Sequence, residues 1–115
     1  MTQVTIIHNP RCSKSRQTLA LLEEQGCNIT VVEYLKQPLS NLEISDILKK
    51  LAISPRELMR TKEDEYKQLG LAAVEDDSLL IQAMVDTPKL LERPIVLAND
   101  KAAIGRPPEN VLSIL

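Results

Sequence analysis

The chain has 115 residues, 43% of them hydrophobic, and its 14 basic and 16 acidic residues leave a net charge of −2. This length fits one domain with an ordinary core, which must be aliphatic because Tyr34 and Tyr66 are the only aromatic residues. The lack of a basic excess argues against nucleic-acid binding, and the lack of an apolar run of ~20 residues argues against a membrane span.

The first third of the chain predicts a strand, a helix and a second strand. Val4 to His8 is a short apolar run, typical of a buried strand. A helix is expected from about Ser13 to Gln25, with Gly26 as its C-terminal stop. Residues 29–34 are rich in β-branched side chains and predict the second strand. Two strands joined by a helix in this way should pair in parallel.

The middle of the chain predicts helices. Ser40 and Glu43 have the spacing of a capping box, which marks the start of a helix. Residues 54–57 repeat this signal, with proline at the first helical position. Further helical segments are expected over residues 63–69, which Gly70 would stop, and over residues 77–86, which end before Thr87-Pro88.

The last quarter returns to strands. Residues 95–98 and residues 101–104 read as two strands that a turn at Asn99-Asp100 connects, and a final helix begins at Pro107. The whole order is β-α-β, then helices, then β-β-α. It predicts one α/β domain over residues 1–115 with a thioredoxin-like, glutaredoxin-type mixed sheet of four strands. The helical insertion, residues 40–91 approximately, separates its N-terminal βαβ and C-terminal ββα halves.

Cys12 is the candidate nucleophile because it lies between a strand and the start of a helix. The first N–H groups of a helix have no partners within the helix, and the helix dipole adds partial positive charge there. A thiol held at this place loses its proton more readily, and the thiolate is the reactive form. Arg11 and Arg16 add positive charge nearby. The same segment is therefore suited to bind an anion.

Other cysteine chemistries fit the spacing poorly. Cys12 is followed by Ser15 in a C-x-x-S pattern, so a thiol from elsewhere must complete any redox cycle. Threonine at position 18 rules out the Cys-to-Arg spacing of phosphatase loops. Two cysteines and one histidine without paired spacing predict no metal site. Cys27 is expected at the far end of the first helix, as a structural thiol or, alternatively, as a resolving thiol for Cys12. The low cysteine count and the absence of a signal-peptide pattern favour a reduced, cytoplasmic setting.

Five further residues are candidates for the same site. His8 ends the first strand and is interpreted as tuning the thiol or holding the loop. Ser15 is one turn into the helix, where its hydroxyl could donate to the thiolate or cap the helix. The other three are arginines, whose guanidinium groups suit tetrahedral oxyanions. Arg93 precedes the proline that opens the third strand, and in a thioredoxin-like fold this proline lies beside the active cysteine. The remaining two arginines are Arg60 and Arg106.

Several separated segments resemble the glutaredoxin-linked arsenate reductases. The similarity extends over essentially the whole chain with compatible spacing. It rests on His8-Asn9-Pro10-Arg11-Cys12-Ser13-Lys14-Ser15-Arg16-Gln17-Thr18-Leu19, on Leu58-Met59-Arg60 with Glu63, Tyr66 and Leu69-Gly70-Leu71, on Leu90-Leu91-Glu92-Arg93-Pro94-Ile95-Val96, and on Gly105-Arg106-Pro107-Pro108-Glu109.

The resemblance implies reduction of arsenate to arsenite, with Cys12 as the nucleophile in a covalent Cys–arsenate intermediate. It also implies glutathione as co-substrate, glutaredoxin as protein partner and no bound cofactor. The oxyanion ligands would be Arg60, Arg93 and Arg106, and His8 and Ser15 would support the thiolate. The chain departs from the family pattern around the cysteine: Arg11 stands where a small residue is usual and Ser13 where glycine is usual, and Lys14 follows. These three residues are expected to narrow the pocket or change its charge.

Two other functions fit the same fold. One is a monothiol glutaredoxin-like oxidoreductase that acts on glutathione mixed disulfides. The other is a redox-responsive regulator that binds RNA polymerase. Relatives of that last kind tend to carry a C-x-x-C switch, which Cys12-Ser13-Lys14-Ser15 lacks.

Overall fold

The computed structural model describes residues 2–115, which form two compact units. The sheet unit comprises Met1–Gln37 and Arg93–Leu115, and the helical unit comprises Pro38–Glu92. The helical unit nearly coincides with the insertion predicted for residues 40–91. A single domain over residues 1–115 stays a prediction.

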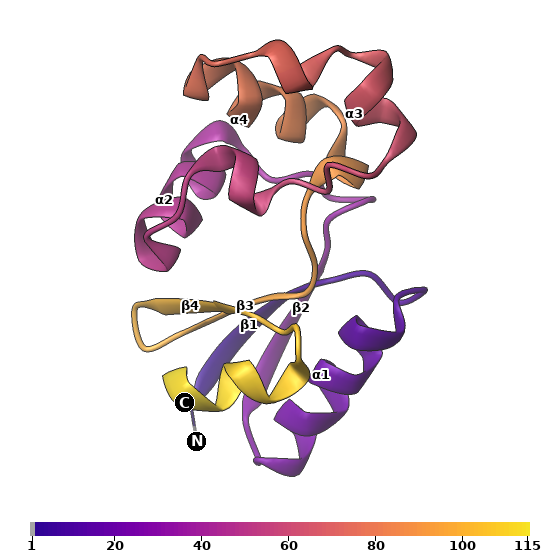
Figure 1. Cartoon of the computed structure of the whole chain (residues 1–115). Coiled ribbons are helices and arrows are strands. Elements are labelled where there is room, and N and C mark those ends of the chain that lie inside the picture. The colour runs from indigo at the N-terminus through magenta and orange to yellow at the C-terminus, as the bar shows by residue number, and fades with distance from the viewer. Residues whose placement is uncertain (1) are drawn as a thin grey trace. The chain divides into compact units, whose positions relative to one another are not determined.

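The sheet unit contains the four predicted strands. Two of them, β1 (Gln3–His8) and β2 (Asn28–Glu33), pair in parallel and are connected by helix α1 (Ser13–Glu24). The others, β3 (Ile95–Ala98) and β4 (Lys101–Ile104), extend the sheet in antiparallel fashion to give the order β2-β1-β3-β4. A 3₁₀ helix, η4 (Pro108–Ile114), follows β4 (Figure 1). The predicted mixed sheet of four strands is therefore confirmed.

Turns at the ends of these elements follow from the local sequence. Gly26 has a φ of +72°, a left-handed conformation that glycine adopts without steric cost, and α1 ends just before it. Asn99 and Asp100 both have positive φ values, 53° and 61°, which suits the tight turn between two antiparallel strands. The register then places Val96 opposite both Ile6 and Ala103.

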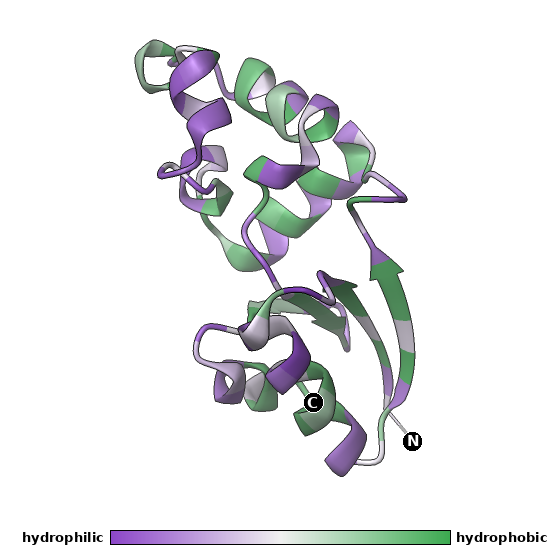
Figure 2. Ribbon diagram, turned by 90° about the vertical axis from the view of Figure 1, so that its right-hand side faces the viewer, coloured by the Kyte–Doolittle hydropathy of each residue, from purple (hydrophilic) through white to green (hydrophobic). Residues whose placement is uncertain are grey.

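One face of the sheet packs on the two helices of this unit. α1 and η4 lie on the same side of the sheet (Figure 1). The strands are largely hydrophobic (Figure 2), and alternate residues along them point to this face. The core between sheet and helices consists of Val4, Ile6, Leu22, Val96, Ala98, Ala103, Val111 and Ile114.

The helical unit contains three short α-helices and three 3₁₀ segments. The α-helices are α2 (Asn41–Leu51), α3 (Asp64–Gln68) and α4 (Asp77–Asp86), and the 3₁₀ segments are η1 (Pro55–Leu58), η2 (Leu71–Ala73) and η3 (Pro88–Leu90). The predicted capping box is present, because the Ser40 hydroxyl accepts from the Glu43 amide at 3.1 Å and the Glu43 carboxylate accepts from the Ser40 amide at 3.0 Å. Within residues 2–115, no helix is long and apolar enough to cross a membrane.

Candidate functional site

Cys12 occupies the N-cap position of α1 in an extended conformation. Its carbonyl accepts the first bond of the helix, from the Arg16 amide at 3.0 Å. The amides of residues 13–15 therefore precede the first bond of the helix and point away from it. The Cys12 side chain is partly exposed and forms no disulfide. The first turn of α1 contains no acidic residue, so no local carboxylate opposes the positive end of the helix dipole.

Hydrogen bonds between nearby residues hold the loop before Cys12 in one conformation. The Asn9 carbonyl accepts from the Cys12 amide at 3.0 Å, and the Asn9 side chain accepts from the Arg11 amide at 3.0 Å. A guanidinium nitrogen of Arg16 donates to the Pro10 carbonyl at 3.0 Å. Asn9 and Arg16 thus position the loop, a role that was not predicted for either residue. The position of an asparagine in a turn before a proline was the available signal.

Arg106 reaches Cys12 from the far end of the chain. Its Nη2 lies 3.5 Å from the Cys12 sulfur, and its Nε donates to the Arg93 carbonyl at 2.7 Å. The Arg93–Pro94 and Arg106–Pro107 peptide bonds are both cis. The two contacts of Arg106 thus connect the Cys12 sulfur with the Arg93 carbonyl. A guanidinium at this distance can stabilise a thiolate and present further N–H donors to an oxyanion.

His8 and Ser15 form a buried pair at the base of the loop. His8 Nδ1 lies 2.5 Å from Ser15 Oγ, which also accepts from the Asn9 amide at 3.0 Å. Burial lowers the pKa of His8, the Glu33 carboxylate acts in the opposite direction, and Arg16 lowers it further. The neutral imidazole is thus favoured. Donation from the Ser15 hydroxyl to the Cys12 thiolate stays a prediction, because the described bonds of this hydroxyl join His8 and Asn9.

Gly105 allows the chain to approach α1 closely just before Arg106. A Cβ at this position would lie 2.5 Å from Thr18 Oγ1 and 2.8 Å from Pro94 Cγ. The Gly105 amide donates to the Pro94 carbonyl at 2.9 Å, and Thr18 Oγ1 donates to the Lys14 carbonyl at 2.8 Å. Glycine at position 105 is therefore part of how Arg106 reaches the sulfur.

Arg60, the third predicted arginine, lies in the helical unit. Its amide donates to the Leu90 carbonyl at 2.7 Å, next to an isolated bridge between Met59 and Leu91. Its Nε lies 3.1 Å from the Glu63 carboxylate, which also lies 3.6 Å from Lys89 Nζ. The role of Arg60 as an oxyanion ligand stays a prediction.

Cys27 is partly buried and packs against the core of the sheet unit. It is a free thiol just after α1, whereas Cys12 caps the opposite end of that helix. This setting agrees with a structural thiol.

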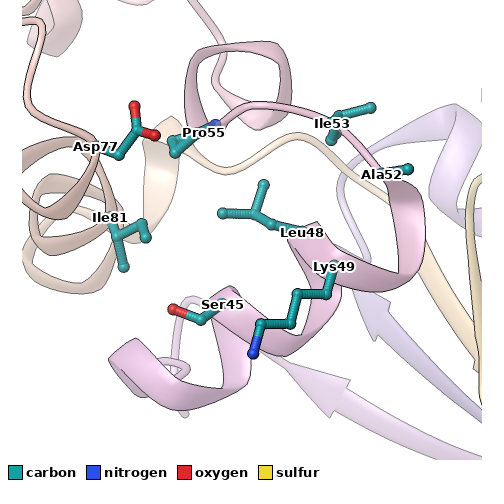
Figure 3. A pocket seen from close by; sticks show the side chains of 8 residues that line it. All are labelled: Ser45, Leu48, Lys49, Ala52, Ile53, Pro55, Asp77 and Ile81. Atoms are coloured by element: carbon teal, nitrogen blue, oxygen red, sulfur yellow. The ribbon is translucent and has the colours of Figure 1, made fainter.

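Two cavities differ in whether predicted site residues line them. One of about 360 Å³ lies in the helical unit, and residues of α2, of α4 and of the segment between them line it: Ser45, Leu48, Lys49, Ala52, Ile53, Pro55, Asp77 and Ile81 (Figure 3). It contains none of the predicted site residues. The other, of about 230 Å³, lies in the sheet unit and is lined in part by residues 8–11 of the Cys12 loop. Among residues 2–115, no cluster of three histidine, cysteine or acidic side chains is arranged to hold a metal ion.

Comparison with known proteins gives consistent matches over the full chain. The model of the ArsC family matches residues 7–114. An uncharacterised Escherichia coli protein, YfgD, is 61% identical and aligns over 98% of this chain and 97% of its own length. An arsenate reductase of Neisseria meningitidis serogroup A is 53% identical over 100% of both chains. The solved structure of an arsenate reductase from Vibrio cholerae is 48% identical, with a TM-score of 0.96 over 99% of this chain and 98% of that one. The predicted thioredoxin-like fold is thus confirmed.

Proposed function

The chain belongs to the ArsC family, and from that premise we propose that it reduces arsenate to arsenite with the Cys12 sulfur as nucleophile. Arsenate reductases that are 53% and 49% identical over nearly the whole chain support this assignment of the reaction. The observation that carries the proposal is the 3.5 Å contact between Arg106 Nη2 and the Cys12 sulfur at the N-terminus of α1.

In the first step, the site binds a dihydrogen arsenate ion. The free amides at the start of α1 and the guanidinium of Arg106 supply donors for its oxygens, and we assign the same role to Arg93 and Arg60. Groups fixed by the fold before the substrate arrives need little rearrangement as charge develops. The bonds from Asn9 and Arg16 to the Cys12 loop contribute to this fixed geometry.

In the second step, the Cys12 sulfur attacks arsenic. A sulfur–arsenic bond forms from the thiolate, one arsenic–oxygen bond breaks, and the departing oxygen leaves as water with the two protons of the dihydrogen arsenate ion. The product is a Cys12–S–arsenate adduct in which arsenic is still pentavalent. Arg106 lies beside this sulfur and would offset the negative charge of the adduct.

In the third step, glutathione reduces the adduct. Its thiolate attacks the Cys12 sulfur, the sulfur–arsenic bond breaks, and arsenic keeps the electron pair and leaves as trivalent arsenite. The two sulfurs are oxidised to a mixed disulfide, which a glutaredoxin thiolate then resolves by taking the glutathionyl group. An external thiol is needed because position 15 holds serine. The proposal places the protein in the cytoplasm, where thiols stay reduced.

The test is a coupled assay that follows arsenate-dependent NADPH oxidation in the presence of glutathione, glutaredoxin and glutathione reductase. Cys12→Ser should abolish turnover, because a serine hydroxyl is a far weaker nucleophile. Cys27→Ser is the matched control, since it removes the other thiol of the chain, and it should retain the wild-type rate. Turnover by the Cys12→Ser protein at the original rate would remove Cys12 as the nucleophile.

The same proteins separate this reaction from that of a monothiol glutaredoxin. A small glutathione mixed disulfide replaces arsenate in the assay, and its reduction is measured at equal protein concentration. The proposal requires the arsenate reaction to be the faster of the two. Reduction of the mixed disulfide without any arsenate-dependent turnover would instead assign the protein to thiol–disulfide exchange.

A further inference from the structure

A second binding feature lies beside Cys12 and has no role in the steps assigned so far. It is the cavity of about 230 Å³ at the carboxyl ends of β1 and β2. It is lined by residues 8–11 and by Glu33, Leu35 and Lys36. Ligands of α/β sheets commonly bind at the carboxyl ends of parallel strands. We refer to this feature as the β1–β2 cavity.

The charges of the β1–β2 cavity define the chemistry of its ligand. Arg11 and Lys36 are cationic and exposed, and Glu33 supplies one carboxylate. Lys36 Nζ lies 3.7 Å from the Glu33 carboxylate, with side-chain exposures of 78% and 40%. An ion pair that exposed contributes little, so Lys36 can turn to a ligand carboxylate at small cost. A carboxylate at one end of a ligand would complement Arg11 and Lys36, and an ammonium group beside it would complement Glu33.

We propose that the β1–β2 cavity binds one end of an acidic thiol peptide of the glutathione class, which is the co-substrate of the reaction proposed above. The inference thus rests on the proposed function and assigns a site to its reductant. Glutathione has two carboxylates, one ammonium group and a thiol on its central residue. Arg11 and Lys36 bind a carboxylate of this peptide, and the exposed Leu35 packs against its backbone. The cavity is smaller than the ~300 Å³ lower bound for sites that enclose drug-sized ligands, so it holds an end of the peptide and leaves the rest outside.

The position of Arg11 allows the peptide thiol to reach Cys12. Consecutive Cα atoms are about 3.8 Å apart, and a residue of extended peptide spans at most about 3.6 Å. Arg11 directly precedes Cys12 in the chain, so a peptide whose terminal carboxylate binds Arg11 has its central residue free to extend towards the Cys12 sulfur. The thiolate then attacks that sulfur, a disulfide forms, and arsenite leaves with the electron pair of the broken sulfur–arsenic bond. Two electrons pass from the two sulfurs to arsenic, so the step balances.

The experiment measures the dependence of turnover on glutathione and on arsenate separately. Arg11→Gln and Lys36→Gln should each raise the KM for glutathione, by about three- to tenfold, because each removes a charged contact to a carboxylate. The KM for arsenate and the kcat should change by less than about twofold. Lys101→Gln is the matched control. It makes the same change of charge at the start of β4. Lys101 pairs with Ala98, and Ala98 pairs with Val4, so the control lies at the opposite end of β1 from His8.

A glutathione diester, whose carboxylates are masked, identifies the contact. The wild-type protein should use the diester less well than glutathione, and the Arg11→Gln/Lys36→Gln protein should use both alike. An unchanged KM for glutathione in that double variant, or a rise confined to the KM for arsenate, would overturn the inference while leaving the proposed function intact.

Failure of the proposed function is distinguishable from failure of this site. If the wild-type protein shows no arsenate-dependent turnover, the rate at which oxidised glutathione forms a mixed disulfide with Cys12 is measured instead. That exchange joins Cys12 to one glutathionyl group and releases the other as a thiolate, and it needs no arsenate. A slower exchange in the double variant, but not in Lys101→Gln, would support the cavity as a glutathione site. Equal rates in all three proteins would exclude it.

Discussion

Replacing Gly105 with alanine should both destabilise the protein and weaken the site. The added Cβ would lie 2.5 Å from Thr18 Oγ1, 3.1 Å from Thr18 Cγ2 and 2.8 Å from Pro94 Cγ. Rotation of Thr18 would break the bond from its Oγ1 to the Lys14 carbonyl and move its methyl group within fully buried surroundings. The ring of Pro94 is rigid and buried as well. The backbone at position 105 must therefore move.

The expected loss of stability is about 1–3 kcal/mol, the usual cost of one extra methyl group in a packed interior. The movement also displaces Arg106, whose Nη2 contacts the Cys12 sulfur at 3.5 Å. Misplacement of a catalytic contact by about 1 Å can lower activity by about 10²-fold. Urea unfolding measures the first effect, and kcat/KM for arsenate measures the second. The loss of activity should exceed what the unfolded fraction explains.

Two further variants separate the effect of packing at position 105 from a general loss of stability. Val4→Ala removes core volume at the opposite end of β1 from His8, so it should lower stability and leave kcat/KM nearly unchanged. Thr18→Ala in the Gly105→Ala background should recover part of the lost stability by making room for the new methyl group, with a coupling energy of about 0.5–3 kcal/mol. If Gly105→Ala is as stable as the wild type, or if Thr18→Ala adds a further independent loss, close packing at position 105 does not position Arg106.

Two other predictions concern His8 and the helical unit. Burial lowers the pKa of His8, so the unfolded chain binds more protons than the folded one below pH ~6.5. The contribution of His8 to stability is therefore full above pH ~6.5 and is lost as the pH falls through the pKa of the folded state. Thermal unfolding between pH 7.5 and pH 5 should therefore show a smaller acid-dependent loss in His8→Gln than in the wild type, and equal losses would contradict a neutral buried imidazole. Ser40→Ala removes the side-chain bond to the Glu43 amide and should cost about 0.5–2 kcal/mol in urea unfolding, whereas the same change at the exposed Ser113 should cost clearly less.

Local signals in the sequence were sufficient for most of the fold. Apolar runs predicted β3 and β4 at their observed bounds, and the pair Ser40 and Glu43 marked the start of α2 because capping depends only on residues three apart. Helix type was less predictable. Residues 55–58 and 108–114 form 3₁₀ helices, and the proline that marks a first helical turn does not determine whether that turn continues as an α-helix.

The candidate site required information that local pattern does not contain. The position of Cys12 at a strand–helix junction followed from the sequence, because both elements are local. The contact between Arg106 and Cys12 joins residues 94 positions apart, and it depends on the glycine at position 105 and the close approach to Thr18. No periodicity could have indicated that packing. The partner of Ser15 was likewise undetermined, since a hydroxyl at the base of the loop can reach either a thiolate or a neighbouring imidazole, and the structure pairs it with His8.

Residues that differ from the family pattern add positive charge around Cys12, and this charge indicates a function for them. Arg11 and Lys14 are exposed and flank a cysteine that already lies beside Arg106 and the N-terminus of α1. If Arg11 acted only by adding positive potential for arsenate, its main effect would be on the affinity of the protein for arsenate. Arg11 lines the β1–β2 cavity together with Lys36, and we assign its guanidinium to the carboxylate of the thiol peptide. The kinetic effect of Arg11→Gln therefore decides between the two roles, because a substrate contact raises the KM for arsenate and a reductant contact raises the KM for glutathione.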